Sequence, residues 1–367
     1  MKISICFFLF VCFFNCLMSQ TNDNSIDTNL SLIEKKFEDS IKKINKNSLI
    51  FTNSRVDFNK GINFYNMANY KEAILCFKNS ISIDSSFSKS YYFLALSYDK
   101  INDSLAIQNY KLAFSFDSTN FDPLYSLSQY YKARLNYNQS KLILDIILKI
   151  DRKQYQAYYD IGVLSYLQLN YIDAITSFSK AIDLKSDYNF FNDRASCYRL
   201  LDSNHLAIKD YLSSININPD ESFVYNNLAS TYNHIGDFEN AHKYCSLSIE
   251  KDPNYILAYN TRATVYIKFD KLEYALNDIN LALSIDSSYS PLYNNKGIIL
   301  YKTEKYVQAL ENFNKAISID NNYAKAYMNR GITRQVLRDE VGACDDWNKA
   351  KELGIKLANT YIINDCN

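Results

Sequence analysis

The sequence predicts an all-α solenoid, and three observations lead to that prediction. One pattern returns nine times between residues 54 and 357, at a spacing of 33 or 34 residues. Each unit carries two stretches with apolar residues at i, i+3, i+4 and i+7, which indicates two amphipathic helices. Pro219, Pro253, Gly236 and Gly354 fall between these stretches. A fixed period of this length is typical of a solenoid, in which each unit buries its apolar face only against its neighbours.

Each unit reads as a first helix, a short turn, a second helix and a second turn. Small residues recur at position 8 of the first helix, where they let two helices approach closely. These residues are Gly61, Ala95, Ser128, Gly162, Ala195, Ala229, Ala263, Gly297 and Gly331. The units that they define begin near residues 54, 88, 121, 155, 189, 222, 256, 290 and 324.

The helix breakers agree with this register. Pro219 and Pro253 stand between units, where a second helix must stop. Pro123 and Pro291 fall in the first turn of a first helix, where a missing N–H costs nothing. Gly354 follows the last predicted helix pair and suits a C-cap.

The pattern resembles the tetratricopeptide repeat, a 34-residue helix–turn–helix unit. The resemblance rests on small residues at positions 8, 20 and 27 and on aromatic residues at positions 11 and 24. In the unit from residue 256 the small residues are Ala263, Ala275 and Ala282, with Tyr266 at position 11. The likeness is to exported bacterial proteins of this family. It implies a right-handed superhelical solenoid of about nine repeats, with N- and C-terminal capping helices.

The N-terminus has the layout of a secretory signal peptide over residues 1–19. Met1-Lys2 precedes a short apolar run that is broken at Asn15, and Ser19 suits cleavage. An uncleaved anchor and a lipidated Cys16 remain as alternatives. With cleavage we expect no stable membrane span, and a protein that is periplasmic, outer-membrane-associated or secreted.

Residues 20–53 form a polar segment followed by one apolar helical stripe. The stripe contains Ile26, Leu30, Ile33, Phe37, Ile41 and Ile44. We expect a capping helix that covers the first repeat; a coiled coil that forms a dimer is the alternative.

At the other end, residues 358–367 complete a helix that caps the last repeat. The turn at Gly354 brings Cys344 and Cys366 to a similar height on two antiparallel helices, ten residues before and twelve after it. An exported protein can keep a disulfide there, and the ending resembles that of many exported bacterial relatives. Two free thiols are the alternative.

The chain shows no sign of catalysis. Signal, repeats and caps account for all 367 residues, and no phosphate-binding glycine loop or nucleophile elbow occurs. We therefore expect no enzyme and no cofactor. The three histidines, His205, His234 and His242, lack the pattern of a metal site. Net charge is zero, without a basic stripe, which argues against nucleic-acid binding.

In the family that the chain resembles, the first helices line an inner groove, with positions 5 and 6 pointing inward. Those positions carry Asn192, Asn226, Asn227, Asn260, Asn294, Asn295 and Asn329. An amide both donates and accepts, so such a row could hold a peptide main chain. It is similar to the asparagine ladder of O-linked N-acetylglucosamine transferase. The alternative is that asparagine is simply common in this sequence. The lysine and arginine pattern that grips chaperone tails is absent.

The function expected from these features is a protein–protein interaction scaffold or adaptor, whose concave groove binds an extended peptide or partner protein of unknown identity. One alternative is an envelope assembly factor that binds glycan or lipid components. A second alternative is a non-catalytic regulatory subunit of a separate enzyme.

Overall fold

The protein is all-α over the residues that the computed structural model describes, 24–366. This part of the chain contains nineteen helices and no strand. The expected signal peptide lies outside the described residues. The chain divides into two compact units, residues 1–143 and 144–367, with the division inside α7 (Tyr137–Ile150).

The first unit holds the helices of the first repeats. They are α2 (Asn24–Asn66), α3 (Tyr70–Ile83), α4 (Ser88–Lys100), α5 (Leu105–Phe116) and α6 (Asp122–Ala133). The even-numbered helices are the first helices of repeats, and α2 packs against α3 as α4 does against α5. Rings fill the contact between the first two repeats, since Phe58 of α2 lies 5.7 Å from Phe77 and 5.6 Å from Phe93.

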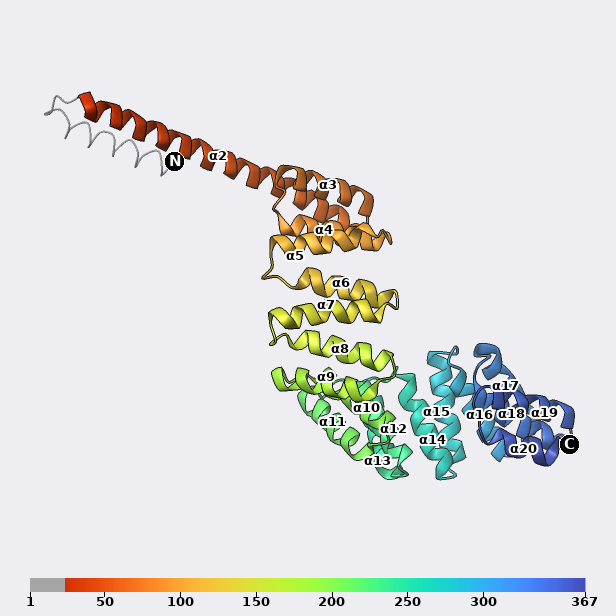
Figure 1. The fold of residues 1–367 in the computed structure, drawn as a ribbon. Helices are drawn as coiled ribbons and strands as arrows, with labels where there is room; N and C mark the ends of the chain where they lie inside the picture. The colour runs from red at the N-terminus through yellow and green to blue at the C-terminus, as the bar shows by residue number, and fades with distance from the viewer. Residues whose placement is uncertain (1–23, 367) are drawn as a thin grey trace. The chain divides into compact units, whose positions relative to one another are not determined.

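The second unit continues the same alternation (Figure 1). Its helices are α8 (Tyr155–Leu167), α9 (Tyr171–Leu184), α10 (Tyr188–Leu200), α11 (Asn204–Ile217), α12 (Ser222–His234), α13 (Phe238–Lys251), α14 (Ile256–Lys268), α15 (Leu272–Ile285), α16 (Ser290–Lys302), α17 (Tyr306–Ile319), α18 (Ala324–Val336), α19 (Glu340–Glu352) and α20 (Ala358–Asp365). The helix pairs match the nine predicted repeats, so that α10 and α11 form repeat five and α18 and α19 form repeat nine.

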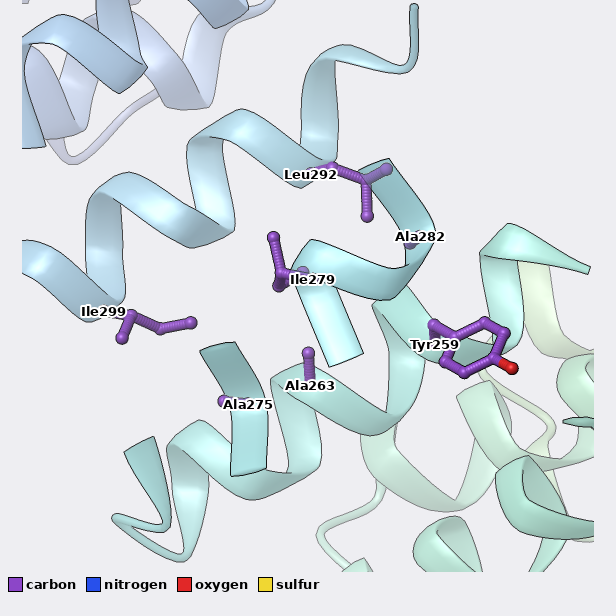
Figure 2. Close-up of a cluster of buried hydrophobic side chains, with 7 residues drawn as sticks. All are labelled: Tyr259, Ala263, Ala275, Ile279, Ala282, Leu292 and Ile299. Carbon is purple, nitrogen blue, oxygen red and sulfur yellow. The ribbon is translucent and has the colours of Figure 1, made fainter. Parts of the chain in front are cut away.

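The core clusters around Phe178, Tyr211 and Ile279 each join two successive repeats, as a solenoid requires. The cluster in Figure 2 draws Tyr259 and Ala263 from α14, Ala275, Ile279 and Ala282 from α15, and Leu292 and Ile299 from α16. Most of these side chains are fully buried. The small residues at positions 8, 20 and 27 therefore pack as the sequence predicted.

Residues 24–53 differ from the expected separate cap. They form one continuous helix with the first helix of repeat one, because residues 24–66 contain no proline and only one glycine, Gly61. Leu32, Ile33 and Ile44 on this helix are 53–63% exposed. The described part of the segment thus extends α2 and does not fold back over the first repeat.

The turns between the two helices of each repeat share one backbone device. One residue in each turn has positive φ, among them Asp270 (57°) and Leu169 (61°). The N–H of the next residue then bonds to the carbonyl five positions back, as Lys271 does to Tyr266 at 2.9 Å. Only Gly236 in these turns is a glycine, with φ of 83°. The register of the turn is therefore set by packing of the two helices more than by turn residues.

Candidate functional site

The first helices of repeats five to nine form an inner layer. Successive first helices contact one another, α10 with α12, α12 with α14, α14 with α16 and α16 with α18. Such contacts require close spacing, which puts these helices on the inner side of the second unit. All seven predicted asparagines lie on this layer.

The asparagines bind one another across repeats. Asn329 Nδ2 donates to Asn294 Oδ1 at 2.9 Å, and Asn295 Nδ2 donates to Asn260 Oδ1 at 2.8 Å. A longer bond of 3.4 Å from Asn294 to Asn295 joins these two rungs within α16. We call the chain Asn329–Asn294–Asn295–Asn260 the amide ladder. In each rung, position 6 of one repeat donates to position 5 of the repeat before it.

A second set begins in repeat six. Asn227 Nδ2 donates to Asn192 Oδ1 at 3.0 Å, and Asn192 Nδ2 donates to Asp193 Oδ1 at 2.9 Å. The hydroxyl of Tyr159 donates to the other oxygen of Asp193 at 2.7 Å. Burial raises the pKa of Asp193, and these two hydrogen bonds oppose the rise.

The two sets do not join, because one rung is missing. Asn226 is at position 5 and should receive a donor from position 6 of repeat seven, where Thr261 stands. The Thr261 hydroxyl donates to the carbonyl of Leu257 in its own helix instead. Asn226 is buried and its Oδ1 has no hydrogen-bond partner.

Mutual pairing changes what the asparagines can offer a ligand. Asn192, Asn226, Asn294 and Asn295 are buried at 2–7% exposure, whereas Asn227, Asn260 and Asn329 are half-buried. A primary amide has two N–H donors and one oxygen with two lone pairs, so a rung uses only part of its capacity. The half-buried amides keep hydrogen-bonding capacity toward solvent, while the buried ones position them.

A pocket of about 400 Å³ lies over the amide ladder in repeats seven to nine. Its polar lining comes from the ladder together with Thr264, Tyr323 and Lys325, and its apolar lining comes from Pro291, Ile298, Met328 and Ile355. Burial raises the pKa of Tyr323 to about 12, so its phenol stays protonated at neutral pH. We call this space the groove pocket. It combines neutral amides, an apolar wall and one exposed cation, Lys325.

Buried ion pairs hold the inner helices in place, and they were not predicted. In repeats five, seven and nine, an arginine of the first helix makes two bonds of 2.6–2.9 Å to an aspartate of the second. The pairs are Arg194–Asp210, Arg262–Asp278 and Arg330–Asp346. Each arginine also reaches the second helix of the preceding repeat, at Ser179, Ser246 and Asn314.

The energetics of these pairs favour the charged state. Burial by itself lowers the pKa of Arg262, but the hydrogen bonds and charge of Asp278 outweigh it and the pKa rises. The same holds for Arg194 beside Asp210. The sequence contained a pattern that could have indicated these pairs. The three arginines follow one another at a spacing of 68 residues, which is two repeats, and so do the three aspartates.

The two cysteines of the predicted disulfide are bonded in the structure. Cys344 lies on α19, Cys366 is the C-cap of α20, and their Cα atoms are 5.7 Å apart. Cys197 and Cys245 are buried free thiols, and burial raises the pKa of each to about 12. They are therefore poor nucleophiles at neutral pH.

Other chemistry finds little support in the described residues. No three His, Cys, Asp or Glu side chains within residues 24–366 come together as metal ligands. His242 instead pairs with the hydroxyl of Tyr266 at 3.0 Å. Of the helices in the same range, none combines the length and apolar character needed to cross a bilayer.

Comparison with known proteins identifies the repeat. Two family models, both of the tetratricopeptide repeat, match residues 210–243 and 290–323. A search of curated proteins finds no match. Among solved structures, a tetratricopeptide repeat protein from Parabacteroides merdae is similar with a TM-score of 0.59 at 16% identity, covering 67% of this chain and 99% of that one.

A second similar structure is the APC/C hetero-tetramer Cut9-Hcn1. Its TM-score is 0.57 at 12% identity, over 86% of this chain and 76% of that one. At these identities both likenesses concern the fold.

Proposed function

Because the chain is a tetratricopeptide-repeat protein, and such repeats serve as scaffolds for protein–protein interactions, we propose that it binds an extended segment of a partner protein along the inner layer of repeats five to nine. The observation that carries the proposal is the groove pocket over the amide ladder. Tetratricopeptide-repeat proteins are generally non-catalytic, and the proposed role is binding alone.

The chemistry of the pocket suits a peptide main chain. Neutral amides both donate and accept, so they match the alternating N–H and C=O groups of an extended segment without reading its side chains. Ile298, Met328 and Ile355 offer an apolar side chain a place to be buried. Pre-formed amides also reduce the entropy lost on binding, since the ladder already fixes their rotamers.

We further propose that the protein works outside the cytoplasm, in the bacterial envelope or beyond it. The support is the signal-like sequence of residues 1–19 together with the Cys344–Cys366 disulfide, since disulfides persist in oxidising compartments. Fractionation of the source cells tests this proposal. Recovery of the protein in the cytoplasm with its N-terminal segment intact would contradict it.

The binding proposal is tested by affinity capture with matched variants. The groove variant combines Lys325→Ala and Asn329→Ala, which removes one exposed and one half-buried pocket residue. The control combines Glu311→Ala and Lys315→Ala, two exposed residues of α17 outside the pocket. Each protein is immobilised, exposed to an extract of the source cells, washed, and analysed by mass spectrometry.

A partner protein retained by the native chain and the control, but lost from the groove variant, supports the proposal. Equal retention of the partner on all three immobilised proteins would mean that the partner binds elsewhere on the chain. Retention of glycan or lipid in place of protein would instead favour a role in envelope assembly. These interpretations require that both variants are folded. Circular dichroism should therefore give unfolding midpoints of both variants close to that of the native chain.

A further inference from the structure

The groove pocket takes part of its wall from the end of the last repeat, after its second helix. Ile355 lies in the connection between α19 and α20 and lines the pocket together with Met328 of α18. Both side chains belong to a cluster around Trp347 and Ala358. Tyr361 of α20 packs on Trp347 with ring centroids 5.0 Å apart. The position of α20 therefore helps to set the shape of the pocket.

A short helix, α20, packs against repeat nine. The helix has eight residues, too few to be stable by itself, and Ala358 is its one buried residue. Ile363 on the same helix is 58% exposed. The Trp347–Tyr361 contact and the packing of Ala358 and Ile362 in the same cluster hold α20 in place. The disulfide between Cys344 and Cys366 is the covalent bond that ties α20 to α19.

This disulfide is open to reagents in solution. Cys344 and Cys366 are each partly exposed, in contrast to the fully buried Cys197 and Cys245. A dithiol reductant can attack one of the two sulfurs, break the S–S bond and form a mixed disulfide. Its second thiol then closes on the first, so the reductant leaves as a disulfide and the protein gains two electrons and two protons as two cysteine thiols.

We propose that the Cys344–Cys366 disulfide is a redox-sensitive latch on the groove pocket. While it is intact, α20 holds Ile355 beside Met328 and the pocket keeps its apolar wall. Reduction releases α20, frees Ile355 and opens the wall. The consequence for a partner rests on the function proposed above, but the coupling between disulfide and pocket does not.

Methionine labelling allows a direct test without any ligand. The chain has four methionines, of which Met67 and Met328 lie within the described residues. The full chain is labelled with ¹³C at the methionine methyl groups, and spectra are recorded before and after addition of dithiothreitol. We expect the Met328 signal to move or broaden and the Met67 signal of repeat one to stay. An unchanged Met328 signal, with both thiols shown free by mass spectrometry, overturns the proposal.

Hydrogen exchange provides the second measurement. We expect the amides of residues 355–366 to exchange at least about tenfold faster after reduction. The reason is that no covalent bond then restrains the local opening of α20. Protection that does not change on reduction would show that packing alone holds α20, and it would also contradict the latch.

The double variant Cys344→Ser and Cys366→Ser is the control. It should give the reduced Met328 spectrum under both conditions. If dithiothreitol still moves Met328 in this variant, the effect comes from another group and the latch is wrong. Capture of the partner by this variant is a separate measurement, so a failure of the proposed function leaves the spectral result intact.

Discussion

Gly297 lies against the ring of Phe313, so closely that a Cβ on the glycine would be 2.6 Å from the ring. The same relationship joins Gly61 to Phe77, Gly162 to Phe178 and Gly331 to Trp347, always 16 residues apart. In each case the ring crosses from the second helix of a repeat onto the first. Glycine at position 8 is therefore required by a neighbour and not by backbone conformation.

Gly297→Ala should lower stability although alanine is the better helix former. The helix gains about 1 kcal/mol in propensity, but a methyl group forced onto a fully buried ring costs about 1–3 kcal/mol in a packed core, and relaxation of the two helices adds to that. We expect a lower urea midpoint by circular dichroism. Adding Phe313→Leu should recover much of the loss, whereas a stability gain from Gly297→Ala alone would contradict the account.

The buried ion pairs predict a larger effect. Asp278→Ala leaves the guanidinium of Arg262 buried without its partner, and breaking such a pair costs about 3–5 kcal/mol. Side-chain exposure is 18% for Arg262 and 3% for Asp278, so solvent screens the pair little. The measurement is again urea unfolding of the full chain.

The matched control replaces both charges, as Arg262→Met with Asp278→Leu. It should be far closer to the native stability than the single variant, because no charge is left unpaired. Equal losses in the single and double variants would mean that packing, and not the charge, is what the aspartate provides.

The repeat explains why so much of the fold could be predicted from the sequence. In a solenoid each side chain contacts residues at fixed sequence offsets of about 16 and 34 positions. The repeat register alone therefore predicts which residues Gly297, Ala309 and Ala316 contact. The continuous α2 was less predictable, since an amphipathic stripe such as that around Ile33 and Ile44 does not say whether a helix folds back. Leu169 has a φ of 61° in the turn between α8 and α9, and nothing in the sequence indicated that conformation either.

The candidate site was predictable only in part. The asparagines were found by position, but their pairing was not, because a hydrogen bond depends on which amide faces which across two repeats. Asn226 and Asn294 occupy the same position, yet one has an unpaired oxygen and the other accepts from Asn329. The wall supplied by Ile355 comes from the turn after α19, where the repeat pattern specifies no apolar residue, so the pattern could not indicate it.

Thr261→Asn should complete the missing rung of the inner layer. An asparagine there has the position from which Asn227, Asn295 and Asn329 donate, and it would supply the donor that Asn226 Oδ1 lacks. We expect a gain of about 1 kcal/mol, the usual net value of a hydrogen bond to a buried group, since threonine and asparagine have similar helix propensities.

A thermodynamic cycle separates this bond from other effects. In an Asn226→Ala background the same Thr261→Asn substitution should give no gain. A gain of equal size in both backgrounds would show that the new asparagine acts by some other contact, and the description of the broken rung would be wrong.

Asp193 predicts a dependence on pH. Burial raises its pKa in the folded protein above the value near 3.9 of an unfolded chain. The folded state therefore holds the proton more tightly, and the carboxyl supports the fold while it is protonated. As pH rises from the unfolded pKa through the folded pKa this support is lost, so at neutral pH the ionised side chain weakens the protein.

Asp193→Asn should consequently raise stability at pH 7 and change it little below about pH 3.9. The amide keeps an oxygen for one of the two donors, Asn192 or Tyr159, and it removes the half-buried charge. Asp286→Asn is the control with opposite sign, because hydrogen bonds from Ser288 lower the pKa of that exposed carboxylate. Its loss should weaken the protein at pH 7 and not at low pH. If Asp193→Asn changes the stability equally at both pH values, packing is responsible for the change. The ionised carboxylate would then not destabilise the folded protein.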